Sequence, residues 1–173
     1  MIREATVTDI PVLQDIEVRA GQPFADVGMT AVAGDEPLPA ETLGEFVLDG
    51  RAWVWDPGDG VPVGYLIASV VDGMAHIDQV SVLPGLRGAR IGRRLIDRAV
   101  RWAADGGLPA ITLTTFTEVP WNGPYYRRLG FRYLDRSEET PQLRALRAAE
   151  AAHGLDMWPR ACMRAEIATW RYA

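Results

Sequence analysis

Two hydrophobic periods alternate along the chain. Short runs rich in β-branched and aromatic residues predict strands, and stretches with apolar residues at three- and four-residue steps predict helices. The predicted strands cover residues 2–6, 51–55, 63–71, 75–83, 110–116, 131–134 and about 160–167. The predicted helices cover about 8–20, 40–48, 90–105, 125–129 and 140–153.

The connections between these elements predict how the strands pair. Residues 57–60 (Pro-Gly-Asp-Gly) and 72–73 (Asp-Gly) are typical hairpin turns, so we expect the strands between 51 and 83 to be antiparallel neighbours. The helix over 90–105 then connects two strands as a crossover, which predicts that strands 75–83 and 110–116 are parallel. The pattern therefore predicts an α/β protein of the α+β type with a mixed sheet.

Residues 22–38 show neither period. Phe24 and other apolar residues lie there among several glycines and prolines. A connection of this length often forms a binding lip or lid, but its apolar side chains could equally pin it to the core. Both interpretations stay open.

The stretch 80–94 has the sequence of a strand, a loop of small residues and a helix start. The first amides of a helix have no partner inside the helix and lie at the positive end of its dipole, so they bind phosphate groups. Gly88, Ala89 and Gly92 keep side chains out of the way, and arginines at 87, 90, 93 and 94 add positive charge. An ordinary strand-to-helix connection is the competing interpretation of this stretch alone.

Composition limits the classes of function. The chain of 173 residues is expected to form one domain over 1–173, and its net charge of −5 does not suggest nucleic-acid binding. No apolar run approaches the roughly 18 residues of a membrane span, so we expect a cytoplasmic protein. The single cysteine, Cys162, is expected to be buried, and His76 and His153 have no metal-ligand spacing, so no metal is expected.

Two motifs resemble the GNAT superfamily of N-acetyltransferases. The family's acetyl-CoA signature, Gln/Arg-x-x-Gly-x-Gly/Ala at the start of the central helix, is similar to residues 87–92, Arg-Gly-Ala-Arg-Ile-Gly. Arg90 stands where the family usually has its first glycine. Because a residue in a helical first turn needs no positive φ, we expect the turn to be kept. The second motif, a tyrosine before a Gly-Phe pair, matches Tyr126 with Gly130 and Phe131.

This resemblance covers nearly the whole chain and implies a fold and a co-substrate. The fold would be a mixed, mostly antiparallel sheet of six to seven strands with helices on both faces, its fourth and fifth strands parallel and splayed around acetyl-CoA. The pantetheine would pair with backbone at Val80 and Val82, and the diphosphate would lie on the amides from Arg87 to Arg93. The implied cofactor-binding residues are Val80, Ser81, Val82, Arg87, Gly88, Ala89, Arg90, Ile91, Gly92, Arg93, Asn122 and Tyr125.

The resemblance also implies roles in catalysis. Tyr126 matches the family's general acid, and a core tyrosine on a short helix is the alternative. Asp78 is the first candidate for the base, because an acid in an apolar strand is costly unless it is paired or functional. Its burial would raise its pKa; a solvent-facing or paired carboxylate is the competing interpretation. Glu118 is the second candidate, and a water chain without a single base stays open. Asn122 is expected either to bind pantetheine or substrate, or to cap the short helix.

The resemblance implies that the acceptor is a primary amine, which the sequence does not identify further. Residues 22–38, Trp121 and the segment 155–159 are expected to set selectivity, with Phe24, Trp121 and Trp158 suggesting a partly aromatic pocket. Two other functions stay open: a non-catalytic acyl-CoA-binding sensor or regulatory module, and a domain that binds another phosphate ligand. The last strand and the helix at 140–153 could support a homodimer, but packing within the chain explains both equally well.

Overall fold

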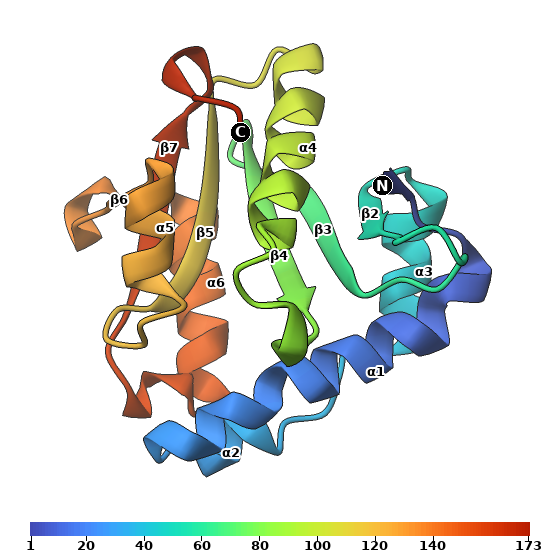
Figure 1. Cartoon of the computed structure of the whole chain (residues 1–173). Helices are drawn as coiled ribbons and strands as arrows, with labels where there is room; N and C mark the ends of the chain where they lie inside the picture. Colours follow the sequence, from blue (N-terminus) through green and yellow to red (C-terminus); the bar gives the residue numbers. More distant parts are fainter. The chain divides into compact units, whose positions relative to one another are not determined.

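The computed structural model describes residues 1–173 and contains seven strands and six α-helices (Figure 1). The strands are β1 (Ile2–Glu4), β2 (Ala52–Trp55), β3 (Gly64–Val71), β4 (Met74–Val82), β5 (Ala110–Phe116), β6 (Arg132–Tyr133) and β7 (Arg160–Glu166). The helices are α1 (Ile10–Gly21), α2 (Thr30–Ala33), α3 (Ala40–Leu48), α4 (Ile91–Asp105), α5 (Gly123–Leu129) and α6 (Pro141–Ala152).

The strands form one mixed sheet in the order β1-β2-β3-β4-β5-β7-β6. Strands β4 and β5 are parallel, with Ala75 opposite Ile111 and His76 opposite Thr112. The other neighbouring pairs are antiparallel, which confirms the predicted mixed and mostly antiparallel sheet. Splaying of β4 from β5 stays a prediction.

The chain divides into two compact units. The first contains Met1–Ala68 and Asp78–Ala99, and the second contains Ser69–Ile77 and Val100–Ala173. Because β3, β4 and α4 each contribute residues to both units, the division does not follow the order of the chain. A single domain over 1–173 stays a prediction.

In the first unit, helices cover both faces of β2 and β3. The side chains of Val54, Tyr65 and Ile67 pack with apolar residues of α1 and α3 in one core cluster. Successive strand residues point to opposite faces. Trp53 accordingly lies on the other face, where the Arg98 guanidinium of α4 lies 5.0 Å from its ring centre.

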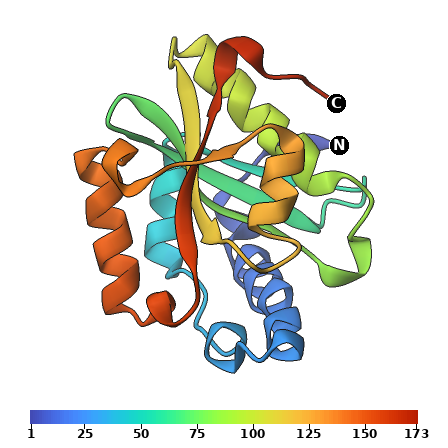
Figure 2. The same cartoon turned by 90° about the vertical axis from the view of Figure 1, so that its left-hand side faces the viewer.

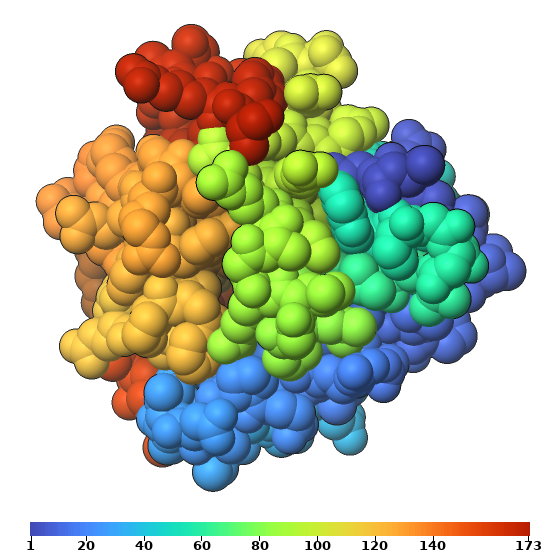
Figure 3. All heavy atoms as spheres, in the orientation of Figure 1, coloured from blue at the N-terminus to red at the C-terminus, as the bar shows by residue number.

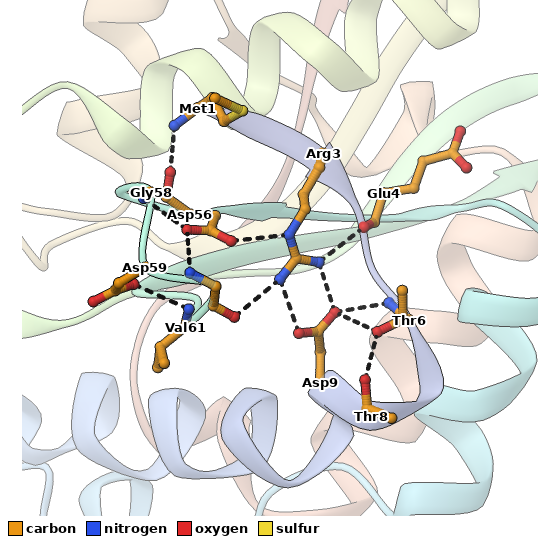
Figure 4. A network of polar contacts seen from close by, with 11 residues as sticks. Met1, Arg3, Glu4, Thr6, Thr8, Asp9, Asp56, Gly58, Asp59 and Val61 are labelled. Carbon is orange, nitrogen blue, oxygen red and sulfur yellow. Dashed lines mark hydrogen bonds and ion pairs between the residues drawn. The ribbon is translucent and has the colours of Figure 1, made fainter.

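A network of polar contacts joins β1, the start of α1 and the turn after β2 (Figure 4). Arg3 donates to the Asp9 carboxylate at 2.8 and 3.0 Å and to the Asp56 carboxylate at 3.1 Å. Burial alone would raise the pKa of Asp9, but hydrogen bonds from Arg3 and Thr6 hold it below its usual value. Asp56 also accepts the amide of Gly58, and its pKa is lowered too. The network therefore stabilises the ionised carboxylates.

The segment 22–38 is more regular than predicted. It contains the 3-10 helix η2 (Gln22–Val27) and the four-residue helix α2. Its end is held by α1: the Gln14 amide donates to the Leu38 carbonyl, and the Leu38 amide donates to Glu17. Glu17 also accepts the Tyr65 hydroxyl at 2.8 Å, and burial raises the pKa of Glu17 despite this bond. The absence of a hydrophobic period in so short a helix explains why the sequence did not predict it.

In the second unit, β7 pairs along the whole of β5, from Ala110 opposite Glu166 to Phe116 opposite Arg160. Helix α5 lies on one side of β5 and β7, and α6 lies on the other (Figure 2). A core cluster under α6 contains Leu143 and Cys162. Cys162 is buried as predicted, and burial raises the pKa of its thiol to about 12. None of the six helices combines the length and apolar character that a membrane span requires.

Candidate functional site

The predicted phosphate-binding stretch is a turn followed by α4 in the first unit. The 3-10 helix η3 (Pro84–Leu86) follows β4 and begins the connection to α4. Residues 85–90 of this connection are exposed. The light-green part of the chain to which they belong lies on the face seen in Figure 3. Gly88 has a φ of +93°, and a Cβ at this position would meet no atom within 4 Å. The turn thus needs glycine there for its backbone conformation, and it leaves open space beside it.

The turn uses some of its own amides. Those of Arg87 and Ala89 donate to the carbonyls of Pro84 and Leu86. Binding of a diphosphate by the amides from Arg87 to Arg93 stays a prediction. The carbonyl of Arg90 accepts the amide of Arg94, which is the first hydrogen bond of α4. The amides of 91–93 therefore lie in the first helical turn, where they have no acceptor within the helix.

Arg93 and Arg94 make contacts with side chains of the first unit. Arg93 forms an ion pair with Asp97 at 3.2 Å, and Arg94 lies over the ring of Trp55, 5.2 Å from its centre. Asp97 balances the charge of Arg93, so the predicted contribution of that side chain to the positive charge is reduced. Arg87 and Arg90 are exposed, and they supply positive charge at the turn.

The backbone conformation of Arg90 differs from the expected one. It lies just before the first residue of α4 and has a φ of +59°, in the left-handed region, instead of the helical first-turn conformation that we expected. The turn has thus kept the backbone shape of a glycine position while carrying an arginine. This conformation costs a residue with a Cβ roughly 1–2 kcal/mol.

The predicted residues of β4 differ in exposure. Val80 and Val82 are half-buried, and Ser81 is buried, with the Gln79 amide donating to its hydroxyl at 2.8 Å. Asp78 is exposed, which agrees with the solvent-facing interpretation of this carboxylate and not with a buried one. Strand alternation still places Asp78 and Val80 on one face unless a bulge intervenes.

Helix α5 in the second unit starts in a crowded place. A Cβ on Gly123 would lie 2.2 Å from the Tyr133 hydroxyl oxygen and 3.0 Å from the Phe116 carbonyl oxygen, so only glycine fits. Asn122 precedes the helix without a side-chain capping bond, which contradicts the capping interpretation. Its side-chain oxygen accepts the hydroxyl of Thr115 on β5 at 3.1 Å, and this bond fixes the orientation of the amide.

Tyr126 belongs to a group of aromatic side chains. Its ring lies edge-to-face with Tyr125, at 5.4 Å between ring centres, and with Phe131, at 5.9 Å. Phe131 in turn contacts Trp170. Burial, with a smaller effect of the charge of Tyr125, raises the pKa of Tyr126 above its usual value. The phenol is therefore protonated at neutral pH and can donate a proton.

The other predicted residues are distributed over both units. Glu118 is exposed, Trp121 and Tyr125 are half-buried in the second unit, and Phe24 is half-buried in η2 of the first unit. Within the second unit, the structure thus brings Asn122, Tyr125 and Tyr126 onto one short helix and its N-terminal residue.

Three threonines of β5 make hydrogen bonds that were not predicted from the sequence. Thr112 bonds the buried His76 ring at 2.8 Å, Thr114 donates to Glu150 of α6, and Thr115 donates to Asn122. Burial lowers the pKa of His76 to about 4, so its ring is neutral. The sequence of the strand, Ile-Thr-Leu-Thr-Thr-Phe, could have indicated these bonds, because hydroxyl groups buried in a strand require hydrogen-bond partners.

Comparison with known proteins decides the family. A family model described as Acetyltransferase (GNAT) family matches residues 23–131, which include the turn before α4 and Tyr126. The chain belongs to the GNAT family. The match includes the region from 87 to 131 that holds both motifs of this GNAT chain.

One curated relative is the peptidyl-lysine N-acetyltransferase YjaB of Salmonella typhimurium. It is 26% identical to this GNAT chain over 98 residues, which cover 57% of this chain and 61% of the relative. The matched region therefore spans less than two thirds of that protein's own length.

Several solved structures share the fold of this chain. A Mycobacterium tuberculosis protein in complex with CoA and NLQ superposes with a TM-score of 0.69 at 21% identity, covering 96% of this chain and 98% of that one. The PaiA N-acetyltransferase of Thermoplasma acidophilum in complex with coenzyme A gives a TM-score of 0.68 at 12% identity, with the same coverage. At these identities the likeness establishes the arrangement of helices and strands.

Proposed function

We propose that this GNAT chain transfers an acetyl group from acetyl-CoA to a primary amine. The observation that carries the proposal is the exposed turn at 85–90 leading into α4, within the region that matches the family. Two neighbours of the same fold were solved with CoA, which supports acetyl-CoA as the co-substrate.

The residues around the turn fit the phosphates of acetyl-CoA. The first-turn amides of Ile91, Gly92 and Arg93 would receive a diphosphate, and exposed Arg87 and Arg90 would neutralise its charge. Val80 and Val82 would pair with the pantetheine, and Ser81, Asn122 and Tyr125 complete the proposed contacts. The open space beside Gly88 and the small side chain of Ala89 let the ligand approach the backbone. When bound, acetyl-CoA supplies an activated acetyl thioester.

Tyr126 is the proposed general acid. Attack of a neutral amine on the thioester carbonyl forms a C–N bond and breaks the C–S bond, so the leaving thiolate needs a proton. The hydroxyl of Tyr126 would donate it, because this phenol is protonated at neutral pH.

The amine must lose a proton before or during attack. Asp78 is the first candidate for the base, Glu118 is the second, and a chain of water molecules is the third. Both carboxylates are exposed to water. This favours a water chain that either carboxylate assists.

A binding titration with acetyl-CoA tests the proposal first. We expect micromolar affinity for the wild type, and an affinity at least about 100-fold weaker for Gly92→Glu, because the new carboxylate would repel the diphosphate. Ala104→Glu is the matched control: it adds the same charge at an exposed position near the other end of α4. Equal affinities for all three proteins would contradict the proposed phosphate site, and no binding by the wild type would contradict the proposed co-substrate.

A non-catalytic acyl-CoA-binding module is the second candidate. The observation that favours it is the exposure of both predicted bases. Such a module needs the turn before α4 but does not need Tyr126. Binding of acetyl-CoA without release of CoA thiol across a broad panel of amines, and unchanged behaviour of Tyr126→Phe, would support the module over the enzyme.

The acceptor is proposed to be a small amine or a peptide amine. The curated relative is a peptidyl-lysine N-acetyltransferase, which supports trying lysine-containing peptides. Phe24 and Trp121 are both half-buried and are proposed to contact the acceptor. Turnover of lysine peptides, measured as released CoA thiol, against simple alkylamines would separate the two classes.

A further inference from the structure

A row of aromatic rings connects the C-terminal end of the chain to Tyr126 in the second unit. Beyond β7, the ring of Trp170 lies edge-to-face with Phe131, at 5.6 Å between ring centres. Phe131 lies in the same way against Tyr126 at 5.9 Å, and Tyr126 also contacts Tyr125 at 5.4 Å. Trp170 therefore reaches Tyr126 through one intervening ring, although the two residues come from distant parts of the sequence.

Main-chain contacts hold the segment that carries Trp170. The 3-10 helix η6 (Ile167–Thr169) follows β7, and the amide of Ile167 donates to the carbonyl of Pro109 at 3.0 Å. The amide of Trp170 then donates to the carbonyl of Ile167 at 3.2 Å. Terminal segments are usually poorly ordered unless such contacts tie them down. These bonds therefore give the ring of Trp170 a defined place beside Phe131.

Phe131 contacts Tyr126 with both its side chain and its main chain. Phe131 is only 4% exposed, and its amide donates to the carbonyl of Tyr126 at 3.1 Å. Gly130 lies between the two residues with a φ of +112°, a conformation that lets the chain fold back after α5. A change in the packing of Phe131 should therefore act directly on Tyr126.

Packing determines where the hydroxyl of Tyr126 lies and how well it keeps its proton. The phenol oxygen lies on the long axis of the ring, so it moves only when the whole side chain tilts. Edge-to-face contacts have a preferred geometry, and those with Tyr125 and Phe131 resist such a tilt. Burial raises the pKa of Tyr126, and Tyr125 is the titratable neighbour that adds to this effect.

We propose that Trp170 is a positioning residue for the acetyl transfer, which fixes the hydroxyl of Tyr126 through the ring of Phe131. This inference rests on the function proposed above, in which Tyr126 donates a proton to the leaving thiolate. It assigns a role to a residue outside both sequence motifs and outside the region that matches the family model, residues 23–131. Trp170 should affect proton donation and not the binding of acetyl-CoA or the amine.

Ionisation of the Tyr126 phenol tests the inference without turnover. Ultraviolet difference absorbance follows tyrosinate formation as the pH rises, and subtracting the curve for Tyr126→Phe in the same background isolates Tyr126. In Trp170→Ala water reaches the rings, so we expect the pKa of Tyr126 to fall toward the ordinary value of about 10. Trp170→Phe keeps a ring against Phe131 and should leave this pKa near that of the wild type. Circular dichroism at the same pH values checks that each variant is folded.

Steady-state kinetics with acetyl-CoA and a lysine-containing peptide gives a second measurement. In Trp170→Ala we expect kcat to fall about tenfold, while the KM for the peptide and the Kd for acetyl-CoA stay within about twofold. The rate should also decline at a lower pH than in the wild type, because a general acid acts only while it is protonated. Trp170→Phe should restore kcat to within about twofold of the wild-type value.

Tyr172→Ala is the matched control, because it removes an aromatic ring from the same terminal segment. Past Trp170 the chain continues toward α4 (Figure 2), where the guanidinium of Arg101 lies 5.0 Å from the ring centre of Tyr172. This variant should change neither kcat nor the ionisation of Tyr126. An unmoved ionisation or an unchanged kcat in folded Trp170→Ala would overturn the inference. Equal losses in Trp170→Ala and Tyr172→Ala would overturn it as well, because they indicate a general loosening of the segment.

The inference and the proposed function fail in different ways. If Tyr126→Phe lowers kcat but Trp170→Ala changes neither kcat nor the ionisation, the proposed acid stands and the inference has failed. If Tyr126→Phe leaves kcat unchanged, the proposed acid itself has failed. If the wild type does not acetylate the peptide, the peptide amine has failed as an acceptor, and the ionisation of Tyr126 decides whether Trp170 positions the phenol.

Discussion

The turn at 85–90 and helix α5 differ in the kind of atom that performs their proposed role, which is backbone in the turn and side chain in the helix. The turn relies on backbone amides, and its side chains point into solvent, so its requirement is a backbone shape. Helix α5 relies on one hydroxyl, that of Tyr126, held by aromatic packing and by the close contacts of Gly123. We learn from this that glycine serves conformation in the first region and space in the second. Substitutions should therefore have different consequences in the two regions.

The largest expected effect comes from Tyr126→Phe. The change removes the proposed proton donor and keeps the ring that packs on Phe131, so kcat should fall by about 100-fold or more while the Kd for acetyl-CoA stays unchanged. Release of CoA thiol and a binding titration measure the two quantities. An unchanged kcat would remove the functional difference between the two regions.

Gly123→Ala should destabilise the protein by about 2 kcal/mol, because a methyl group would overlap the Tyr133 hydroxyl and press on the Phe116 carbonyl. Thermal unfolding should show a melting temperature about 6 °C lower. Gly85→Ala is the control in the turn, where a Cβ meets nothing within 4 Å, and it should be nearly neutral. Similar losses in both variants would show that the two regions do not differ in this way.

Arg3→Met provides a reference for stability outside both regions. We expect a loss of about 2 kcal/mol at pH 7, less than for a fully buried pair, because Arg3 is 31% exposed and water can replace it at Asp9. The lowered pKa values of Asp9 and Asp56 give stability that is present above their unfolded pKa of about 4 and is lost as the pH falls through the folded values. Melting temperatures from pH 7 to pH 3 should therefore fall less steeply in the variant. Parallel curves for the two proteins would contradict this account, and acetyl-CoA affinity should not change.

The smallest expected effect is a gain. Arg90→Gly relieves the left-handed conformation of Arg90 and should stabilise the protein by about 1 kcal/mol, seen as a melting temperature about 3 °C higher. Arg87→Gly is the control, since Arg87 has a φ of −60° and loses the same charge without relief of strain. A lower melting temperature for Arg90→Gly than for Arg87→Gly would mean that the turn does not strain Arg90.

Sequence periods and turn types predicted the strands of the sheet and its one parallel pair, because both are read from neighbouring residues. The two motifs at 87–92 and 126–131 are local as well, and they led to the family that the comparison established. Helix α2 was not predicted, since four residues carry too little periodicity, and the pattern left open whether Asp78 is buried or exposed until the structure showed it exposed.

The sequence by itself determined the order of elements, the parallel crossover at α4 and the identity of the residues in the turn before α4 and on α5. Only the tertiary structure decided the left-handed φ of Arg90, the exposure of Asp78, and the partners of Thr112, Thr114 and Thr115. The physical reason is distance along the chain. Glu150 and Thr114 are 36 residues apart in the sequence. A pattern of neighbouring residues therefore cannot predict that α6 packs against β5. Burial and pairing depend on which elements pack together, and that choice is made by the whole chain.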